Sequence, residues 1–304
     1  MVQKKTLSDR IWKTANYTVL CLLAFTCVYP FFYFLVLSFN DGKDALRGGI
    51  YLWPRMFTFD NYLKAFNHPD ILNAMWITVT RTAIVTVTAL FLCALLAYAL
   101  TFKSLPGRKA LTFFFYFTTL FGGGLIPTYI LYRQIGIMST YWVLIFPSLY
   151  SVWNTLIMRA FFSGLPDSIA ESARIDGAGE LRIFIRLILP LSLPVLATVG
   201  LYIGVGCWND WFTGQYFIMM RPKLLPAATL LNRLLQETSV AMSKAGDSGA
   251  SLQLTDEMHQ SMSNVTTESL RMTFVIIIVT PIMCIYPFLQ KYFVKGALLG
   301  SLKG

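Results

Sequence analysis

The stretch PDSIAESARIDGAGELRIFIRLILP occupies residues 166–190 and is the longest charged segment between two strongly apolar runs. Asp167 is a suitable N-cap for a short helix, because its side-chain oxygen accepts a hydrogen bond from a free backbone amide. The segment 176–179 predicts a turn, since Gly177 and Gly179 adopt positive φ without strain, and a second helix then begins at Glu180. This pattern predicts a helix-turn-helix at a membrane surface that docks a partner.

The second predicted helix of this stretch has two different faces. Arg182 and Arg186 are four residues apart and therefore share one face. The apolar residues between and beside them are expected to enter hydrocarbon or packed protein. These residues are Leu181, Ile183, Ile185 and Leu187.

The composition of the whole chain indicates an integral membrane protein. Of the 304 residues, 56% are hydrophobic and 13% are charged, whereas an ordinary soluble protein has about 25% charged residues. The mean hydropathy is +0.58. The net charge of +10 is not gathered into one soluble module, which disfavours nucleic-acid binding. The five cysteines and two histidines show no spacing typical of a disulfide framework or a metal site, so we expect no bound metal.

Six apolar runs are long enough to cross a hydrocarbon core of about 30 Å, which takes about 20 helical residues. Several contain proline, which a helix bundle tolerates because neighbouring groups bind the freed carbonyls. The runs are 17–39, 74–102, 110–132, 141–162, 187–208 and 273–290. The sequence therefore predicts an all-α protein with six transmembrane helices.

The positions of lysine and arginine predict the orientation of these spans. The basic residues of the N-terminus, of the loop between spans two and three, of the segment 159–186 and of the tail all fall on one side when there are six spans. The positive-inside rule assigns that side to the cytoplasm. The expected division is a cytoplasmic segment 1–16, a first helix 17–39, an extracytoplasmic loop 40–73, a core of five further helices 74–295 and a cytoplasmic tail 296–304. The core includes a cytoplasmic element 163–186 and an extracytoplasmic loop 209–272, of which residues 237–269 are polar and are expected to be partly flexible.

Candidates for a solute pathway lie near the outer ends of the spans. Gly122 to Pro127 permits either close backbone packing or a local break that faces solute. The run from Trp208 to Trp211 is compatible with a sugar-binding platform, although an interfacial aromatic belt explains the same residues better on chemistry alone. Arg81 lies near a membrane end, where snorkelling to the interface is favoured over binding of an anionic solute. The candidate pathway residues are Gly123, Gly124, Tyr129, Asn154, Trp208, Asn209, Asp210 and Trp211.

The sequence lacks an internal energy source. It contains no phosphate-binding loop of the kind Gly-x-x-x-x-Gly-Lys-Ser/Thr, so we do not expect this chain to hydrolyse ATP or to act as an enzyme. No acidic residue falls in the middle of a predicted span, which disfavours an ion-coupled secondary transporter. A membrane-embedded enzyme would need a carboxylate or metal constellation, and the pair Asp41 and Asp44 is a weak one. Energy is therefore expected to reach the chain through a contact on its cytoplasmic face.

The stretch 166–190 resembles the cytoplasmic signature of binding-protein-dependent ABC importer permeases. That signature is Glu-Ala-Ala, three residues, Gly, nine residues, Ile, any residue, Leu-Pro. Glu171, Gly177 and Leu189-Pro190 hold every interval, with Ser172 and Leu187 as conservative departures. Further segments are similar to the maltose-permease-related carbohydrate-uptake family, and more narrowly to its YtcP/LplC-like subgroup of oligosaccharide permeases. They are GGGLIPTY at 122–129, WNDWF at 208–212, YPFLQKYFVKG at 286–296 and GSLKG at 300–304.

This resemblance implies a MetI-like, type I importer fold in a bacterial plasma membrane, with both termini in the cytoplasm. It implies a carbohydrate importer made of this chain, a second permease, two cytoplasmic ATPase subunits that bind ATP and Mg, and an extracytoplasmic solute-binding protein. It also implies a coupling helix that sits in a groove of an ATPase subunit. The coupling residues would be Glu171, Ser172, Ala173, Arg174, Asp176, Gly177, Ala178 and Gly179. An importer of another solute is the alternative.

Overall fold

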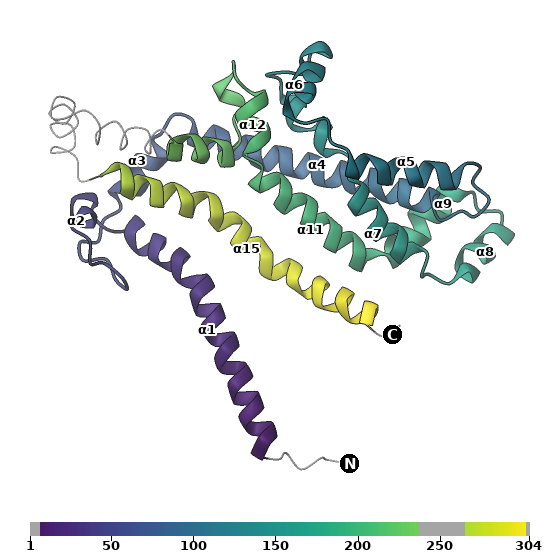
Figure 1. Ribbon diagram of the computed structural model, residues 1–304, viewed down its shortest axis with the longest axis horizontal. Coiled ribbons are helices and arrows are strands. Elements are labelled where there is room, and N and C mark those ends of the chain that lie inside the picture. Colours follow the sequence, from purple (N-terminus) through teal and green to yellow (C-terminus); the bar gives the residue numbers. More distant parts are fainter. Residues whose placement is uncertain (1–6, 237–264, 302–304) are drawn as a thin grey trace. The chain divides into compact units, whose positions relative to one another are not determined.

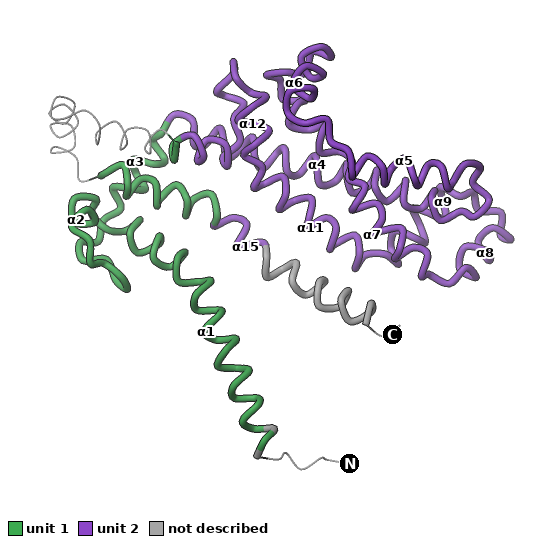
Figure 2. Tube along the Cα trace, viewed as in Figure 1, with its two compact units in different colours: residues 1–68, 234–279 green, residues 69–233, 280–304 purple. Residues whose placement is uncertain are grey.

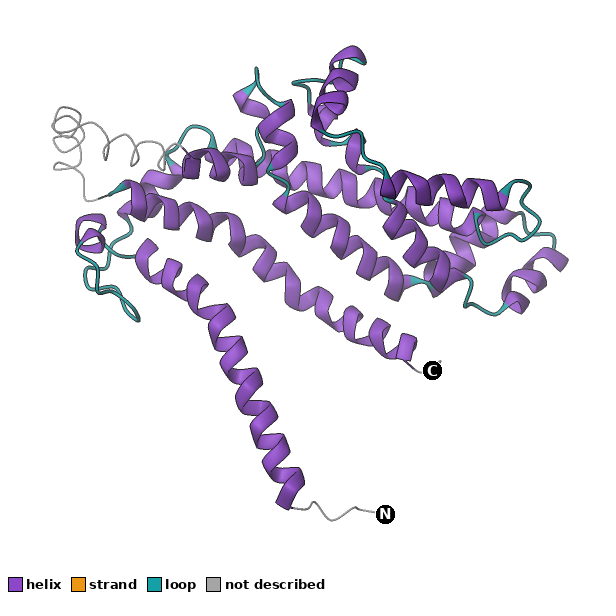
Figure 3. Ribbon diagram, viewed as in Figure 1, coloured by secondary structure: helices purple, strands orange, loops and turns teal. Residues whose placement is uncertain are grey.

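The computed structural model describes residues 7–236 and 265–301, and within these ranges the chain forms helices and no strand (Figures 1 and 3). The long helices are α1 (Leu7–Ser38), α4 (Ile71–Ala99), α11 (Leu193–Asn209) and α15 (Thr267–Ser301). Shorter ones are α2 (Gly42–Leu46), α3 (Asp60–Phe66), α5 (Arg108–Leu120), α6 (Leu125–Gln134), α7 (Val152–Phe162), α8 (Asp167–Ile175), α9 (Glu180–Ile183), α10 (Leu189–Leu191) and α12 (Phe212–Phe217). Residues 227–236 are also helical, as their amphipathic pattern predicts.

Three single-turn elements complete the helical part, namely η1 (Tyr141–Leu144), η2 (Phe146–Ser148) and η4 (Pro222–Leu224). A π-helical turn, η3 (Phe184–Ile188), continues from α9. Helix α1 begins ten residues before the predicted first span, and α15 continues through most of the predicted tail. Most of the polar segment 237–269 lies outside the described residues.

The chain packs as two compact units, which Figure 2 distinguishes by colour. Unit 1 comprises residues 1–68 and 234–279, and unit 2 comprises residues 69–233 and 280–304. The chain therefore leaves unit 1 after residue 68, returns to it at residue 234 and ends in unit 2.

Within residues 7–236 and 265–301 there are up to six candidate spans, the number that the sequence predicts, when each bent pair of helices counts as one span. Three are continuous, over Arg10–Ser38, Ile71–Ala99 and Thr267–Ile285. The other three are bent, by 114° between α5 and α6, by 41° between Tyr141–Ser148 and α7, and by 83° between Glu180–Leu191 and α11. The first bend confirms that the glycines at 122–124 break the helix, and Gly124 has φ 81° there. Such a φ is accessible to glycine and strained for other residues.

The core of unit 2 is formed by α4, α7 and α11, and α4 lies alongside the other two (Figure 1). Small residues allow the close approach of α4 and α11. A Cβ atom built on Gly200 would lie 3.7 Å from Leu90, and one on Gly204 would lie 3.4 Å from Thr86. The buried residues of this core include Val85, Ala89, Cys93, Ala94, Ala97, Met158, Phe184, Val199 and Ile203.

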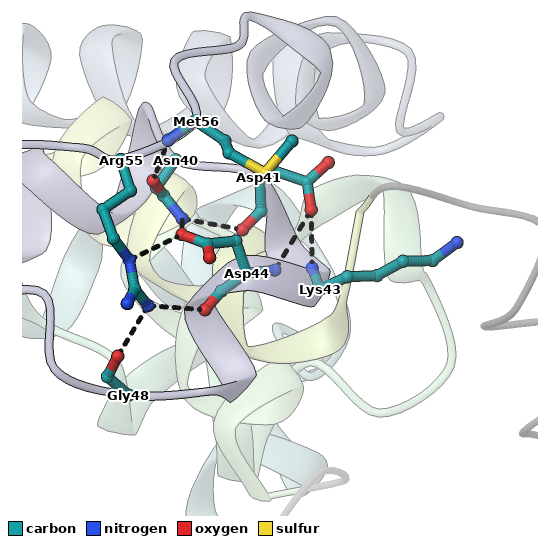
Figure 4. A network of polar contacts seen from close by, with 7 residues as sticks. All are labelled: Asn40, Asp41, Lys43, Asp44, Gly48, Arg55 and Met56. Atoms are coloured by element: carbon teal, nitrogen blue, oxygen red, sulfur yellow. Dashed lines mark hydrogen bonds and ion pairs between the residues drawn. The ribbon is translucent and has the colours of Figure 1, made fainter.

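Unit 1 contains a folded polar cluster in the segment that follows α1 (Figure 4). Asn40 is fully buried, and its amide donates to the Asp44 carboxylate at 3.1 Å while its oxygen accepts from the Met56 amide at 2.9 Å. Arg55 bonds the same Asp44 carboxylate at 3.2 Å and the Gly48 carbonyl at 2.7 Å. Asp41 caps α2 by accepting from the backbone amides of residues 43 and 44. These bonds offset the cost of burying polar groups and give the predicted outer loop a defined structure.

A second buried amide connects this cluster to the start of α15. Asn61 donates to the carbonyls of Ser38 at 3.0 Å and Asn40 at 2.8 Å. Its oxygen accepts from the Ser269 hydroxyl at 2.8 Å. Unit 1 therefore joins segments from the beginning and the end of the chain through polar contacts.

Candidate functional site

The predicted coupling element is formed by α8, a glycine turn and α9 at one end of unit 2 (Figure 1). The turn is a Schellman motif, in which two amides beyond the helix end bind its last carbonyls. The Ala178 amide donates to the Ala173 carbonyl at 2.9 Å, and the Gly177 amide donates to the Arg174 carbonyl at 3.0 Å. Gly177 has φ 77°, the left-handed conformation that this motif requires. The predicted end of the first helix and the predicted start of the second at Glu180 are both confirmed.

The beginning of α8 differs from the sequence prediction by one residue. Pro166 occupies the N-cap position, and Asp167 is the first helical residue without a side-chain capping bond. Asp167 as the N-cap is therefore wrong. Proline fits the extended backbone of this cap, with φ −62° and ψ 126°, while the Asp167 carboxylate remains favourably placed near the positive end of the helix dipole.

Glu180 is the hub that fixes the turn against unit 2. Its carboxylate accepts from Arg174 Nε at 2.6 Å and from Arg174 Nη2 at 3.4 Å. It also accepts from the Tyr98 hydroxyl of α4 at 2.8 Å. The Arg174 guanidinium lies 5.8 Å from the centre of the Phe102 ring, within range of a cation–π interaction. The two helices of the coupling element and the end of α4 thus share one polar contact.

The electrostatics of this hub follow from its hydrogen bonds. Glu180 belongs to the element 163–186, which precedes the predicted fifth span. The hydrogen bond from Arg174 holds the pKa of the Glu180 carboxyl below its ordinary value of 4.5, although partial burial opposes the shift. The same hydrogen bond raises the pKa of Arg174. Both side chains are partly exposed, at 40% for Arg174 and 49% for Glu180, so solvent screens their attraction.

The coupling element has an inner face and an outer face. Ala170, Ala173 and Ala178 pack against the core of unit 2. The outer face contains Ile175, whose surface is 86% exposed. Glu171, Ser172, Asp176 and Gly177 are also exposed. The structure therefore brings all eight predicted coupling residues together on α8 and its turn, with small side chains inward and an exposed isoleucine among polar groups outward.

The second helix of the element is only partly buried within this chain. Ile183 is buried, but Leu181 is 61% exposed and Ile185 is 47% exposed. Both line a shallow groove, together with Gly177, Gly179, Arg182 and Arg186. The π-helical turn η3 changes the angular spacing of side chains. Of the four apolar residues, Ile183 is therefore packed within this chain, and Leu181 and Ile185 stay available to hydrocarbon or to a partner.

Arg81 and Asp210 form an ion pair at the other end of the core of unit 2. Arg81 is fully buried, and its Nε donates to the Leu144 carbonyl at 2.9 Å. Asp210 follows α11 directly and also accepts from the Thr213 amide at 3.0 Å, at the start of α12. The snorkelling position expected for Arg81 is wrong, because the guanidinium points into protein and joins four elements, α4, η1, α11 and α12.

The eight candidate pathway residues do not share one position on unit 2. Gly123 and Gly124 lie at the bend between α5 and α6, Asn154 is buried on α7, and Tyr129 packs beside a separate apolar cluster. Trp208 is buried at 6% exposure, whereas Asn209 is exposed and Trp211 is 40% exposed. The carboxylate of Asp210 already accepts hydrogen bonds from the Arg81 guanidinium and the Thr213 amide. The two tryptophans therefore do not present a pair of open faces around Asn209 and Asp210.

The residues that sequence reasoning missed are those that act across long separations. Tyr98 reaches Glu180 over 82 positions, and Arg81 reaches Asp210 over 129 positions. A charged residue inside an apolar run was the one available signal for Arg81, since a buried charge requires a partner. Nothing in the local pattern of Tyr98 distinguishes it from an interfacial tyrosine.

Comparison with known proteins gives consistent results over the full length. Residues 3–298 match the family model described as binding-protein-dependent transport system inner membrane component. The polygalacturonan/rhamnogalacturonan transport system permease protein YtcP of Bacillus subtilis is 34% identical, over 98% of this chain and 100% of the relative. The protein LplC of Bacillus subtilis is 33% identical, over 98% of this chain and 97% of the relative.

A solved structure supports the same assignment. It is the crystal structure of a bacterial ABC transporter involved in the import of the acidic polysaccharide alginate. One of its chains is similar with a TM-score of 0.82 and 25% identity, and the match covers 96% of this chain and 100% of that chain. The model match, the two relatives and the fold agree over nearly every residue, and the chain therefore belongs to the family of binding-protein-dependent transport system inner membrane components.

Proposed function

We propose that this chain is the permease subunit of an ATP-driven importer for carbohydrate, more narrowly for oligosaccharides. The observation that carries the proposal is the coupling element, whose Schellman turn and Glu180 hub hold α8 rigidly against unit 2 while its outer face stays exposed. The names of the relatives support the solute class, since YtcP is named for polygalacturonan and rhamnogalacturonan and a further relative of Bacillus subtilis is named for maltodextrin.

The proposed assembly contains this chain, a second permease, two ATPase subunits and an extracytoplasmic solute-binding protein. ATP and Mg bind to the ATPase subunits and not to this chain. The bilayer is a bacterial plasma membrane, and both termini and the coupling element face the cytoplasm, as the distribution of lysine and arginine favours.

The proposed mechanism is alternating access. An ATPase subunit binds the outer face of α8, where Ile175 offers an apolar anchor beside Glu171 and Ser172. Closure of the ATPase subunits moves α8, and the contacts of Glu180 with Arg174 and Tyr98 pass that movement to α4. Because packed helices change arrangement as bodies and not by continuous deformation, the movement reorients the spans and opens the opposite face to the solute.

Two substitutions at Gly177 test the role of the turn. In Gly177→Pro, the ring fixes φ near −65°, which is incompatible with the observed 77°, and the amide that binds Arg174 is removed. Gly177→Asn is the matched control, because asparagine adopts left-handed φ more readily than most residues and a Cβ at this position meets no atom within 4 Å. In proteoliposomes with the full complex, we expect Gly177→Pro to lose transport or ATPase assembly and Gly177→Asn to keep most of both.

The solute class has its own measurement. The cognate solute-binding protein is titrated with neutral oligosaccharides, uronate-containing oligosaccharides, amino acids and short peptides, and the saccharide that binds is then offered for transport. Transport of amino acids or peptides without transport of any saccharide would overturn the carbohydrate assignment. For the turn, normal transport by Gly177→Pro would overturn the coupling assignment.

A further inference from the structure

A basic pocket lies between α5 and α7, and the coupling function described above makes no use of it. Its volume is about 520 Å³, and it is open to the surface of unit 2. Three cationic side chains line it, together with the hydroxyl groups of a threonine and a tyrosine and the aromatic rings of a phenylalanine and that tyrosine. The lining residues are Arg108, Lys109, Thr112, Phe113, Tyr116 and Arg159.

The charge of this pocket is uncompensated within the part of the chain that the structure describes. No acidic residue occurs in the sequence between Asp70 and Asp167. None of the ion pairs among the described residues includes a cation of the pocket. Three positive charges gathered in one concavity repel each other, so an anion that enters the pocket is stabilised.

Two of the cations are held in place by the protein. Arg108 donates through Nε to the Leu100 carbonyl at 2.9 Å, and Arg159 donates to the Thr112 hydroxyl at 3.4 Å. A guanidinium has five N–H donors, and the bond to Leu100 uses only the one on Nε of Arg108. The pocket therefore has oriented donors on two different helices, and an anion binds without ordering both long side chains.

The surroundings of the pocket select the kind of anion. Arg108 and Lys109 begin α5, and the helix continues into a run of exposed aromatic residues within a predicted span. Phe113 is 69% exposed, Tyr116 is 48% exposed and Phe117 is 44% exposed. A ligand that contacts both the cationic lining and the exposed aromatic residues has an anionic head group and an apolar tail. A free phosphate or a nucleotide would leave the aromatic part uncovered.

We propose that this pocket binds the phosphate of an anionic phospholipid, such as phosphatidylglycerol or cardiolipin, at the membrane–water boundary. Arg108, Lys109 and Arg159 contact the phosphate oxygens, and the hydroxyl of Tyr116 donates to the head group. The acyl chains lie along Phe113 and Phe117. Helix α5, which provides five of the six lining residues, lies in the part of unit 2 where α9 is also found (Figure 1). The binding site does not depend on the identity of the transported solute.

Native mass spectrometry of the purified complex tests the proposal. The complex is titrated with phosphatidylglycerol, with phosphatidylcholine and, in a separate arm, with inorganic phosphate. We expect bound phosphatidylglycerol in preference to phosphatidylcholine, and about fivefold weaker binding for each cation removed by Lys109→Gln or Arg159→Gln. Arg159→Lys keeps the charge and should retain most of the binding, which separates loss of charge from misfolding.

Lys103→Gln is the matched control, because Lys103 is an exposed cation of the loop that precedes α5 and does not line the pocket. Equal losses in Lys103→Gln and Lys109→Gln would overturn the site in favour of general surface attraction. Competition by inorganic phosphate at the same concentration as the lipid would overturn a lipid occupant. Binding to the isolated chain but not to the assembled complex would show that a partner subunit covers the pocket, and would also overturn the proposal.

Discussion

At the scale of single residues, Arg81 is the most costly side chain in unit 2 to bury. Its guanidinium is fully buried and is positioned by the Leu144 carbonyl and the Asp210 carboxylate. Removal of one member of a buried pair is more harmful than removal of both, because the remaining charge keeps its desolvation cost. The side chain of Asp210 is 22% exposed, so water can reach this carboxylate more easily than it can reach the arginine.

We therefore predict unequal effects from the two members of this pair. Asp210→Ala should lower the free energy of unfolding by about 3 kcal/mol, because a buried cation is left unpaired. Arg81→Met should cost less, and the double variant should be more stable than Asp210→Ala alone. Thermal unfolding of the four proteins in one detergent measures the coupling. If the losses of the two single variants simply add in the double variant, the ion pair is not the source of the effect.

Sequence reasoning identified the side chains at this site but not their roles. The sequence alone shows that the run 208–211 combines aromatic, amide and carboxylate groups, which are the groups that bind sugars. Whether the carboxylate is open to a solute depends on Arg81, which is 129 positions away. Contacts at such separations arise from the packing of whole helices, so local pattern cannot assign them.

At the scale of elements, the coupling element derives its rigidity from one ionisable hub. The ionised Glu180 carboxylate accepts hydrogen bonds from Arg174 and Tyr98, and the protonated form would lose the charge-assisted part of both contacts. The pKa of Glu180 is lower in the folded chain than in the unfolded chain. Its stabilising contribution is therefore complete above the ordinary pKa of 4.5 and is lost as the pH falls through the lower folded value.

This linkage predicts that α8 loosens in acid. Amide hydrogen exchange of residues 167–175, corrected for the intrinsic effect of pH, should accelerate as the pH falls below about 4.5. In Glu180→Gln the exchange should already be faster at neutral pH and should change little on acidification. An unchanged acid response in this variant would assign the pH dependence to another group. The effect should be modest, since both charged partners are partly exposed.

The elements themselves were predictable to different degrees. The end of α8 follows from Gly177, which adopts the left-handed conformation of a helix C-terminus, and the start of α9 follows from Gly179, the extended residue before Glu180. The runs that cross the membrane follow from hydropathy. The bends of 41° and 83° do not, because hydropathy reports the polarity of a segment and not its direction. Proline near each break permits a bend, while its angle is set by packing against neighbouring helices.

At the scale of the whole molecule, the apolar surface indicates what surrounds the chain. In α1, 6% of the most apolar stretch is buried, and such an apolar surface on a membrane protein is typically covered by lipid or by other helices. The match of 0.82 in TM-score over 96% of the chain shows that the overall course of the backbone follows the family. Six spans were predictable from composition because the requirement to bury every backbone polar group leaves few alternatives in a membrane.

The proposed orientation is a prediction at this scale. A fluorescent protein that folds only in the cytoplasm should be bright at either terminus of the full chain. Alkaline phosphatase, which is active only outside the plasma membrane, should be active when inserted within residues 40–73 and inactive when fused to the C-terminus. Phosphatase activity at the C-terminus would reverse the topology that the lysine and arginine positions favour.

The continuity of α4 has a mechanical consequence. Between Ile71 and Ala99 the helix contains neither glycine nor proline, and it carries Arg81 in its first half and Tyr98 in its last turn. At 1.5 Å per residue these side chains are about 25 Å apart along the axis. One uninterrupted helix therefore connects the contact between Tyr98 and Glu180 to the ion pair between Arg81 and Asp210, whereas the neighbouring spans are each bent at a break. A displacement of the coupling turn is therefore passed along α4 to the Arg81–Asp210 pair without crossing a helix break.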